Sequence, residues 1–256
     1  MKRLLKCIAA LLAVFISQAG AASAQTLETE TARLLPAHGW EIGQAFEFQT
    51  SSDGTETALP FAVEYGLSNR FELLVEPVPY TAIRPKIGRH AAGVGDIEAT
   101  LTTLLRHETR STPAFAVAAE VKVPTARDSL IGSREPDYTA YLMASKRFGL
   151  IDTHVNLAYT LVGAQDNVQL NNVWSFAAAG VYRRPNSPLQ LFGEVLGNTA
   201  ALPSNETSGA PEVAGGELVG TVGAGRAIGP VLLYFAVSYD NNNAVLLRPG
   251  ITWKLH

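Results

Sequence analysis

Histidine is the side chain best suited to acid–base chemistry near neutral pH, and this chain has five. Within a predicted strand, His154 has a polar residue two positions on, Asn156, which would place both side chains on one face of the strand. Ser145 stands in the preceding predicted strand, and a serine activated by histidine is a common nucleophile. Asparagine is not a nucleophile, however, and no His-x-Ser pair occurs. A hydrogen-bonded histidine inside the fold is therefore favoured, and we expect no catalytic residue.

Two further patterns could bind a metal ion or a cofactor. Asp240-Asn241-Asn242-Asn243 is rich in oxygen ligands, but it lacks the acidic residues and the spacing of a calcium loop, which favours a tight hairpin loop. The glycines of 220–225, and those at 93 and 95, are not flanked by the strand and helix of a nucleotide site. Such glycines more often allow curvature or close contact between strands. We expect no metal and no cofactor.

The charged residues instead follow a period of two. In Phe115–Val123 the odd positions are apolar, and the even positions include Glu120 and Lys122. Successive side chains of a strand point to opposite faces, so one face is apolar and the other is charged. The same alternation elsewhere assigns to the charged, inner face the residues that we expect to line a lumen: Glu72, Glu98, Arg106, Glu120, Lys122, Arg147, Glu194 and Arg248.

Twelve segments carry this alternation, and most are long enough to cross a bilayer at a tilt, which takes ~9–11 residues. No helical periodicity interrupts them, apart from one turn's length near 29–35. The predicted strands are 40–49, 57–66, 70–79, 96–106, 113–124, 137–148, 152–163, 172–183, 189–197, 217–227, 231–240 and 245–255.

The connections between these strands alternate in length. Those after the even-numbered strands are short, for example 67–69 and 149–151, whereas several after the odd-numbered strands are long, including 80–95, 125–136 and 198–216. Short periplasmic turns and longer outer loops are typical of outer-membrane barrels. We therefore predict an all-β, antiparallel, up-and-down transmembrane barrel of about 12 strands, within a range of 10–14. A soluble β-sandwich, which would cover the apolar face with a second sheet, is the alternative.

The first 24 residues read as a cleaved secretory signal peptide. A basic start, Met1–Lys6, precedes an apolar run and the small-residue site Ala22-Ser23-Ala24. We expect residues 25–256 to form one barrel domain, with 25–39 as a short periplasmic N-terminal segment. Cleavage removes three of the 20 basic residues, and the only cysteine, Cys7, but none of the 23 acidic residues, which leaves a net charge of −6. Such a chain has no disulfide and is too acidic for nucleic acid.

The last predicted strand ends Arg248-Pro249-Gly250-Ile251-Thr252-Trp253-Lys254-Leu255-His256. Its alternating apolar and aromatic residues resemble the terminal targeting signal of outer-membrane proteins, although such chains commonly end on an aromatic residue rather than histidine. The expected partners are the barrel-assembly machinery, reached through this strand, together with outer-membrane lipid and lipopolysaccharide.

Several short motifs occur in a characteristic order along the chain. They include 29–33 with 38–42, Tyr65–Leu73, Gly93–Ile97, Val121–Thr125 and Ser145–Gly149. In order and spacing the series resembles the outer-membrane protein family associated with the meta-cleavage pathway of phenol degradation. The resemblance implies a barrel in the cell outer membrane of Gram-negative bacteria that admits aromatic or other small hydrophobic compounds. It implies no catalytic residues.

Two interpretations of the inner charges remain open. They can form a polar path for a small solute, which would make the protein an uptake channel. Alternatively, they can pair with one another and close the lumen, since buried charges need partners. A closed barrel would then present its outer loops to lipopolysaccharide or protein partners. An outer-membrane lipid hydrolase is the third and least favoured function.

Overall fold

The computed structural model describes residues 27–164, 169–201 and 216–255. Within these ranges sixteen strands form one antiparallel sheet, and no helix is long and apolar enough to cross a membrane. The strands are β1 Trp40–Ala45, β2 Glu47–Thr50, β3 Gly54–Ala58, β4 Phe61–Gly66, β5 Phe71–Pro77, β6 Thr81–Pro85, β7 Ala91–Gly93, β8 Ile97–Arg106, β9 Ala114–Val123, β10 Asp137–Phe148, β11 Ile151–Leu161, β12 Val173–Arg183, β13 Leu189–Asn198, β14 Leu218–Ile228, β15 Val231–Asp240 and β16 Val245–Leu255.

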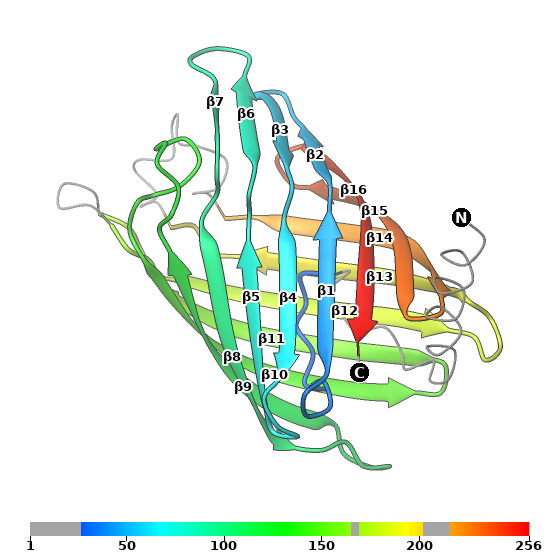
Figure 1. The fold of residues 1–256 in the computed structure, drawn as a ribbon. Helices are drawn as coiled ribbons and strands as arrows, with labels where there is room; N and C mark the ends of the chain where they lie inside the picture. The colour runs from blue at the N-terminus through cyan, green and yellow to red at the C-terminus, as the bar shows by residue number, and fades with distance from the viewer. Residues whose placement is uncertain (1–26, 165–168, 202–215, 256) are drawn as a thin grey trace, which may run out of the picture.

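The sheet closes on itself because β1 pairs with β4 on one side and with β16 on the other. Trp40 lies opposite both Tyr65 of β4 and Leu255 of β16. Twelve strands, β1, β4, β5 and β8 to β16, follow one another around this closed barrel, as Figure 1 shows. The predicted all-β barrel of 12 antiparallel strands is confirmed.

The four remaining strands extend one side of the barrel beyond short breaks in its wall. The breaks fall at Phe46, 59–60, 78–80 and 94–96, so β2, β3, β6 and β7 continue the lines of β1, β4, β5 and β8. Pro60 lies in one break and has no N–H to donate to a ladder. The prediction that 40–49 and 57–66 are unbroken strands was wrong, whereas the predicted strand 70–79 corresponds to β5. The predicted loop 80–95 contains the β6–β7 hairpin.

Side chains of the barrel strands alternate between an exposed outer face and a buried inner face. On β15, Phe235 is 48% exposed and Leu233 45% exposed, whereas Leu232 and Ala236, on either side of this stretch, are each 1% exposed. The exposed residues of the other strands are likewise large and apolar, for example Leu157 and Phe176. The outer surface of the barrel is therefore apolar, and most of its polar side chains point inward.

The two ends of the barrel differ in their connections. We call one the short-turn end, because β10–β11 and β14–β15 are joined there by two residues each. The opposite, long-loop end carries the connection between β9 and β10, and that between β13 and β14. Trp40 and Tyr65 pack together with tilted rings at the short-turn end, with ring centroids 4.3 Å apart, and Tyr159 and Trp174 do so near the long-loop end at 4.7 Å.

Candidate functional site

Most polar side chains of the barrel point into its lumen, and one side of the lumen wall is strongly acidic. Glu41 of β1 lies opposite Glu64 of β4, and Glu76 of β5 lies opposite Glu98 of β8. The complete acidic side spans five neighbouring barrel strands: Glu41, Glu64, Glu72, Glu76, Glu98 and Glu120. Cross-strand neighbours share a face, so these carboxyl groups stand side by side along the inner wall.

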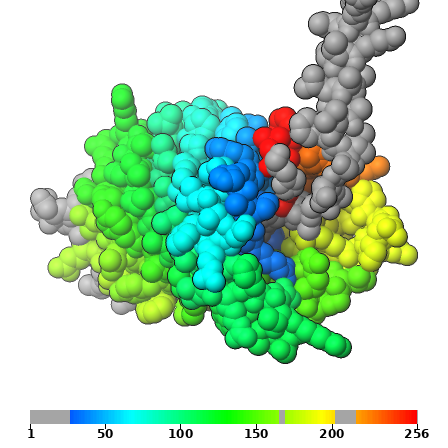
Figure 2. Space-filling view, turned by 60° about the horizontal axis from the view of Figure 1, so that its bottom comes forward, coloured from blue at the N-terminus to red at the C-terminus, as the bar shows by residue number. Residues whose placement is uncertain are grey.

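Residues 27–39, which we call the N-terminal segment, cross the lumen. The amide and hydroxyl of Thr29 both donate to Glu194 of β13. The amide of Ala32 donates to Ser145 Oγ of β10 over 2.9 Å, and the amide of Leu35 donates to a carboxylate oxygen of β5. Since β5, β10 and β13 stand apart around the barrel, the segment lies between them. In Figure 2, which looks toward the short-turn end, its blue atoms lie between the cyan strands and the green and yellow ones.

The prediction that 25–39 form a periplasmic segment is thus wrong for the described residues, 27–39. Thr29 is 1% exposed and Ala32 is fully buried, as expected of residues that fill a lumen rather than lie outside it. The physical reason is that backbone N–H groups of an irregular segment need acceptors, and the inner carboxylates and hydroxyls supply them.

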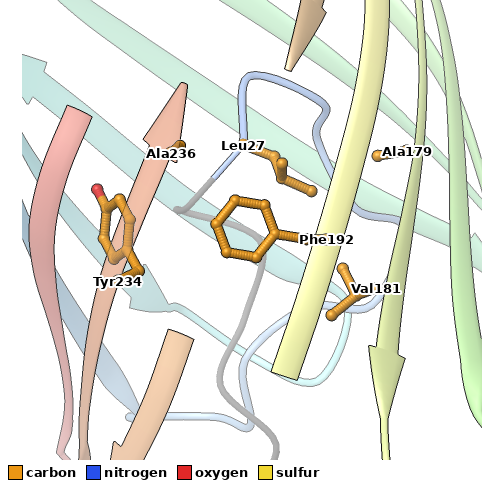
Figure 3. Packing of buried hydrophobic residues seen from close by; sticks show 6 residues of the cluster. All are labelled: Leu27, Ala179, Val181, Phe192, Tyr234 and Ala236. Carbon is orange, nitrogen blue, oxygen red and sulfur yellow. The ribbon is translucent and has the colours of Figure 1, made fainter. Parts of the chain in front are cut away.

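An apolar cluster holds the beginning of the N-terminal segment. Figure 3 shows Leu27 against the ring of Phe192, with Val181 and Tyr234 on either side. A Cβ atom at Gly223 would lie 2.3 Å from Phe192, and one at Gly250 would lie 2.2 Å from Tyr234. Both rings therefore need a glycine on the adjacent strand. The interpretation of the 220–225 glycines as sites of close contact agrees with this packing.

An ionic network, the Asp152 network, fixes the segment at the short-turn end. Asp152 on β11 is 2.8 Å from Arg33 of the segment, 2.7 Å from Arg147 of β10 and 2.8 Å from Arg183 of β12. Its side chain is only 3% exposed. Arg33 also contacts Glu108, in the β8–β9 turn, at 2.6 Å. A buried carboxylate with three guanidinium partners is well compensated, and removing it would take away the negative charge that the three cations share.

Glu108 lies outside the barrel strands and has a perturbed pKa. Desolvation alone would raise the pKa of this carboxyl group, but the amide of Arg147 and the guanidinium of Arg33 outweigh it. The pKa of Glu108 is therefore lowered from its usual 4.5. The charged form is the one that binds Arg33, so this contact persists to more acidic pH than an ordinary glutamate would allow.

Ser145 and His154 meet inside the lumen, one opposite the other on β10 and β11. Ser145 Oγ lies 2.9 Å from His154 Nδ1, and the same oxygen accepts the Ala32 amide. Ser145 is fully buried and His154 is 5% exposed. The pair therefore resembles a nucleophile and its base in composition, but its hydroxyl is engaged by the N-terminal segment.

The predicted lumen residues mostly contact the N-terminal segment or an adjacent strand. Glu72 accepts the Leu35 amide and Glu194 accepts from Thr29, while Arg147 binds Asp152. Glu98 lies opposite Lys122. Arg248 binds Glu28 of the N-terminal segment and Glu47 of β2, and the other contacts are those of Glu120 with Thr100 and Tyr141 and of Lys122 with Asp137 and Ser133. The structure thus places seven of the eight predicted residues on the inner face.

Arg106 is the exception. A register irregularity between Leu104 and Arg106 pairs Arg106 with Phe115, a residue of the exposed face, and Arg106 is itself exposed. The bulge adds one residue to β8, which reverses the alternation beyond it. The prediction that Arg106 lines the lumen was wrong for this reason.

Other residues of the site were not predicted. Asp152 and Arg183 could have been found, because the same alternation that turns His154 inward also turns Asp152 inward. Arg33 and Glu28 carry no such signal, since the N-terminal segment has no periodic pattern. Asp240, in the oxygen-rich 240–243, accepts the amides of Asn242 and Ala244, as in a tight hairpin loop.

Solved structures of known proteins share this fold. The COG4313 outer membrane channel from Pseudomonas putida F1 is 13% identical, with a TM-score of 0.63 over 90% of this chain and 100% of that one. The NanC porin is 10% identical, with a TM-score of 0.59 over 84% and 100%. The KdgM porin, solved with disordered oligogalacturonate, is 12% identical, with a TM-score of 0.55 over 84% and 99%. At these identities the likeness establishes the fold of an outer-membrane channel barrel.

Sequence comparisons do not assign the chain to a family. No known protein family and no curated protein matches the chain. The resemblance to the meta-pathway family stays a prediction.

Proposed function

We propose that this protein is an outer-membrane channel for the uptake of small molecules. The observation that carries the proposal is the combination of a closed barrel, an apolar outer face and a polar lumen. A soluble barrel would gain nothing from exposing Phe235, Leu157 and Phe176, whereas hydrocarbon chains would cover them. The shared fold with outer-membrane channels supports the same conclusion.

In this proposal the short-turn end faces the periplasm and the long-loop end faces outward. The leader, residues 1–24, directs export, and the barrel-assembly machinery recognises the C-terminal strand. Outer-membrane lipid and lipopolysaccharide surround the outer face. The resemblance to the meta-pathway family favours aromatic or other small hydrophobic compounds as solutes.

The N-terminal segment is the obstacle that a solute would meet. A paired-cysteine variant tests whether solutes pass where the segment lies, because the proposed mature chain has no cysteine of its own. Ala32 and Ala116 are fully buried members of one packed cluster, so cysteines are placed at both positions, and loss of free thiol on oxidation shows that the disulfide has formed. In proteoliposomes we expect small-solute permeation by the wild type, lower permeation by the oxidised double variant, and recovery after reduction.

The single variants Ala32→Cys and Ala116→Cys are matched controls and should not respond to reduction. Wild-type barrels that insert and fold but exclude ions and small aromatic solutes alike would contradict the channel function. That outcome would favour the second candidate, a closed barrel that presents its outer loops to partners. The observation that favours this candidate is the dense set of contacts within the lumen.

A further inference from the structure

A small cavity lies inside the barrel near the long-loop end, between the N-terminal segment and β14 to β16. Its volume is about 130 Å³. Leu196, Val219 and Leu246 form an apolar part of its wall, and the hydroxyls of Thr221 and Ser238 form a polar part. An engineered cavity of ~150 Å³ holds a benzene ring, so the present cavity is on the scale of one small ring or a short branched chain.

One cation of the cavity wall already holds two carboxylates. The guanidinium of Arg248 is 2.7 Å from Glu47 of β2 and forms a second ion pair with Glu28 of the N-terminal segment. The side chain of Arg248 is 14% exposed, whereas that of Glu28 is 55% exposed. Glu28 is thus the accessible and Arg248 the enclosed member of this pair.

The guanidinium also has an unused donor. The buried Nε of Arg248 has no hydrogen-bond partner among the described residues. Arginine binds carboxylates best through two parallel N–H donors, so the pair with Glu28 leaves capacity for a better-placed carboxylate. A solute carboxylate that replaced Glu28 would exchange one negative group for another beside the same cation.

From these contacts we infer that the cavity binds a small monocarboxylate, whose carboxylate displaces Glu28 from Arg248. The body of the solute packs against Leu196, Val219 and Leu246, and Thr221 and Ser238 can donate to its oxygens. This inference rests on the proposed channel function and names a solute class for it. Displacing Glu28 would remove one contact of the N-terminal segment with the barrel, while Leu27 and Thr29 would keep theirs.

Nearby acids restrict the ligand to a single negative charge. Glu217 and Asp240 also line the cavity. Asp240 is partly compensated by two backbone amides, those of Asn242 and Ala244. A second carboxylate on the solute would meet these groups without a further cation beside it, since Arg248 is the only Lys or Arg of the described cavity wall.

Calorimetric titration of the folded full-length mature protein in detergent micelles tests the inference, with benzoate as the probe. Benzyl alcohol and benzylamine have the same ring without the negative charge and should bind at least tenfold more weakly. Glu28→Gln removes the competing carboxylate and should tighten benzoate binding about two- to fivefold, the range of an exposed ion pair. Asp53→Asn, which removes the same charge from an exposed turn, should leave the affinity unchanged.

Arg248→Gln should weaken benzoate binding tenfold or more. Arg248→Lys keeps the charge but not the paired donors, so its affinity for benzoate should lie between those of the wild type and Arg248→Gln. If Arg248→Gln fails to fold, as judged by heat-modifiable migration on gels, the change in benzoate affinity of Glu28→Gln tests the inference instead. Unchanged or weaker benzoate binding by Glu28→Gln would overturn the inference, as would equal binding of benzyl alcohol. Permeation of neutral solutes in proteoliposomes is measured separately, so the channel function can hold when this inference fails.

Discussion

Two ionic contacts tie the N-terminal segment to the barrel in opposite ways. At the short-turn end, Arg33 enters a network in which Asp152 is 3% exposed and binds three guanidinium groups. Toward the long-loop end, Glu28 is 55% exposed and reaches a single cation, Arg248. Buried, multiply bonded charges are costly to separate, whereas an exposed ion pair contributes little to stability. The comparison teaches that the contacts of Arg33 form an anchor, whereas the ion pair of Glu28 is exchangeable.

The largest effect should follow from removing the centre of the anchor. Asp152→Asn leaves Arg33, Arg147 and Arg183 facing one another without their shared carboxylate, so we expect a loss of about 3–5 kcal/mol in the free energy of unfolding. Equilibrium urea unfolding in micelles measures it. Asp128→Asn, which breaks an exposed pair with Arg89, is the matched control and should cost less than about 1 kcal/mol. Equal stability of the two variants would contradict the anchor.

A smaller loss should follow from Ser145→Ala. The substitution removes the acceptor of the Ala32 amide and the partner of His154, and both groups are buried. Leaving buried polar groups unsatisfied costs about 1–3 kcal/mol. The same unfolding experiment measures this loss, and Ser187→Ala, in the exposed β12–β13 turn, is its control. A neutral Ser145→Ala would mean that the segment is not held through this hydroxyl.

The anchor was also the part of the molecule that the sequence revealed least. Period-two alternation predicted the positions of the twelve barrel strands, because lipid on one side and a lumen on the other impose it on every residue. The alternation alone did not reveal the breaks at Phe46 and 59–60, although Pro60 is a residue that interrupts strand ladders. It misplaced Arg106, because a bulge of one residue is invisible in a pattern of hydrophobicity.

The N-terminal segment shows a different limit. Its place in the lumen depends on contacts between residues more than 100 positions apart, such as Thr29 with Glu194 and Ala32 with Ser145. No local propensity encodes such contacts. The inward charges were predicted, but most of their partners were not, because partners follow from register and from this irregular segment rather than from spacing.

The anchor should weaken in acid through Glu108. Its pKa is lowered from 4.5 in the folded protein, so the stabilisation from the charged form is present above about pH 4.5 and is lost as the pH falls through the lowered value. Glu108→Gln removes this contribution at all pH values. We therefore expect the wild type to melt at a higher temperature than Glu108→Gln at pH 6, and the difference to shrink toward pH 3. A difference that stays constant over this range would exclude Glu108 as the titrating group.

The smallest effect on stability should come from breaking the ion pair between Glu28 and Arg248. Glu28→Gln breaks an ion pair whose acidic member is more than half exposed, so the free energy of unfolding should fall by less than about 1 kcal/mol. Glu47→Gln is the informative comparison, because Glu47 binds the same guanidinium but is 21% exposed and belongs to the wall. It should cost more than Glu28→Gln, since a more enclosed charge loses more when its partner is removed. Urea unfolding of the two single variants measures the difference. If Glu28→Gln proved the more destabilising, Glu28 would be a structural tie, and a solute could not replace it without unfolding part of the lumen.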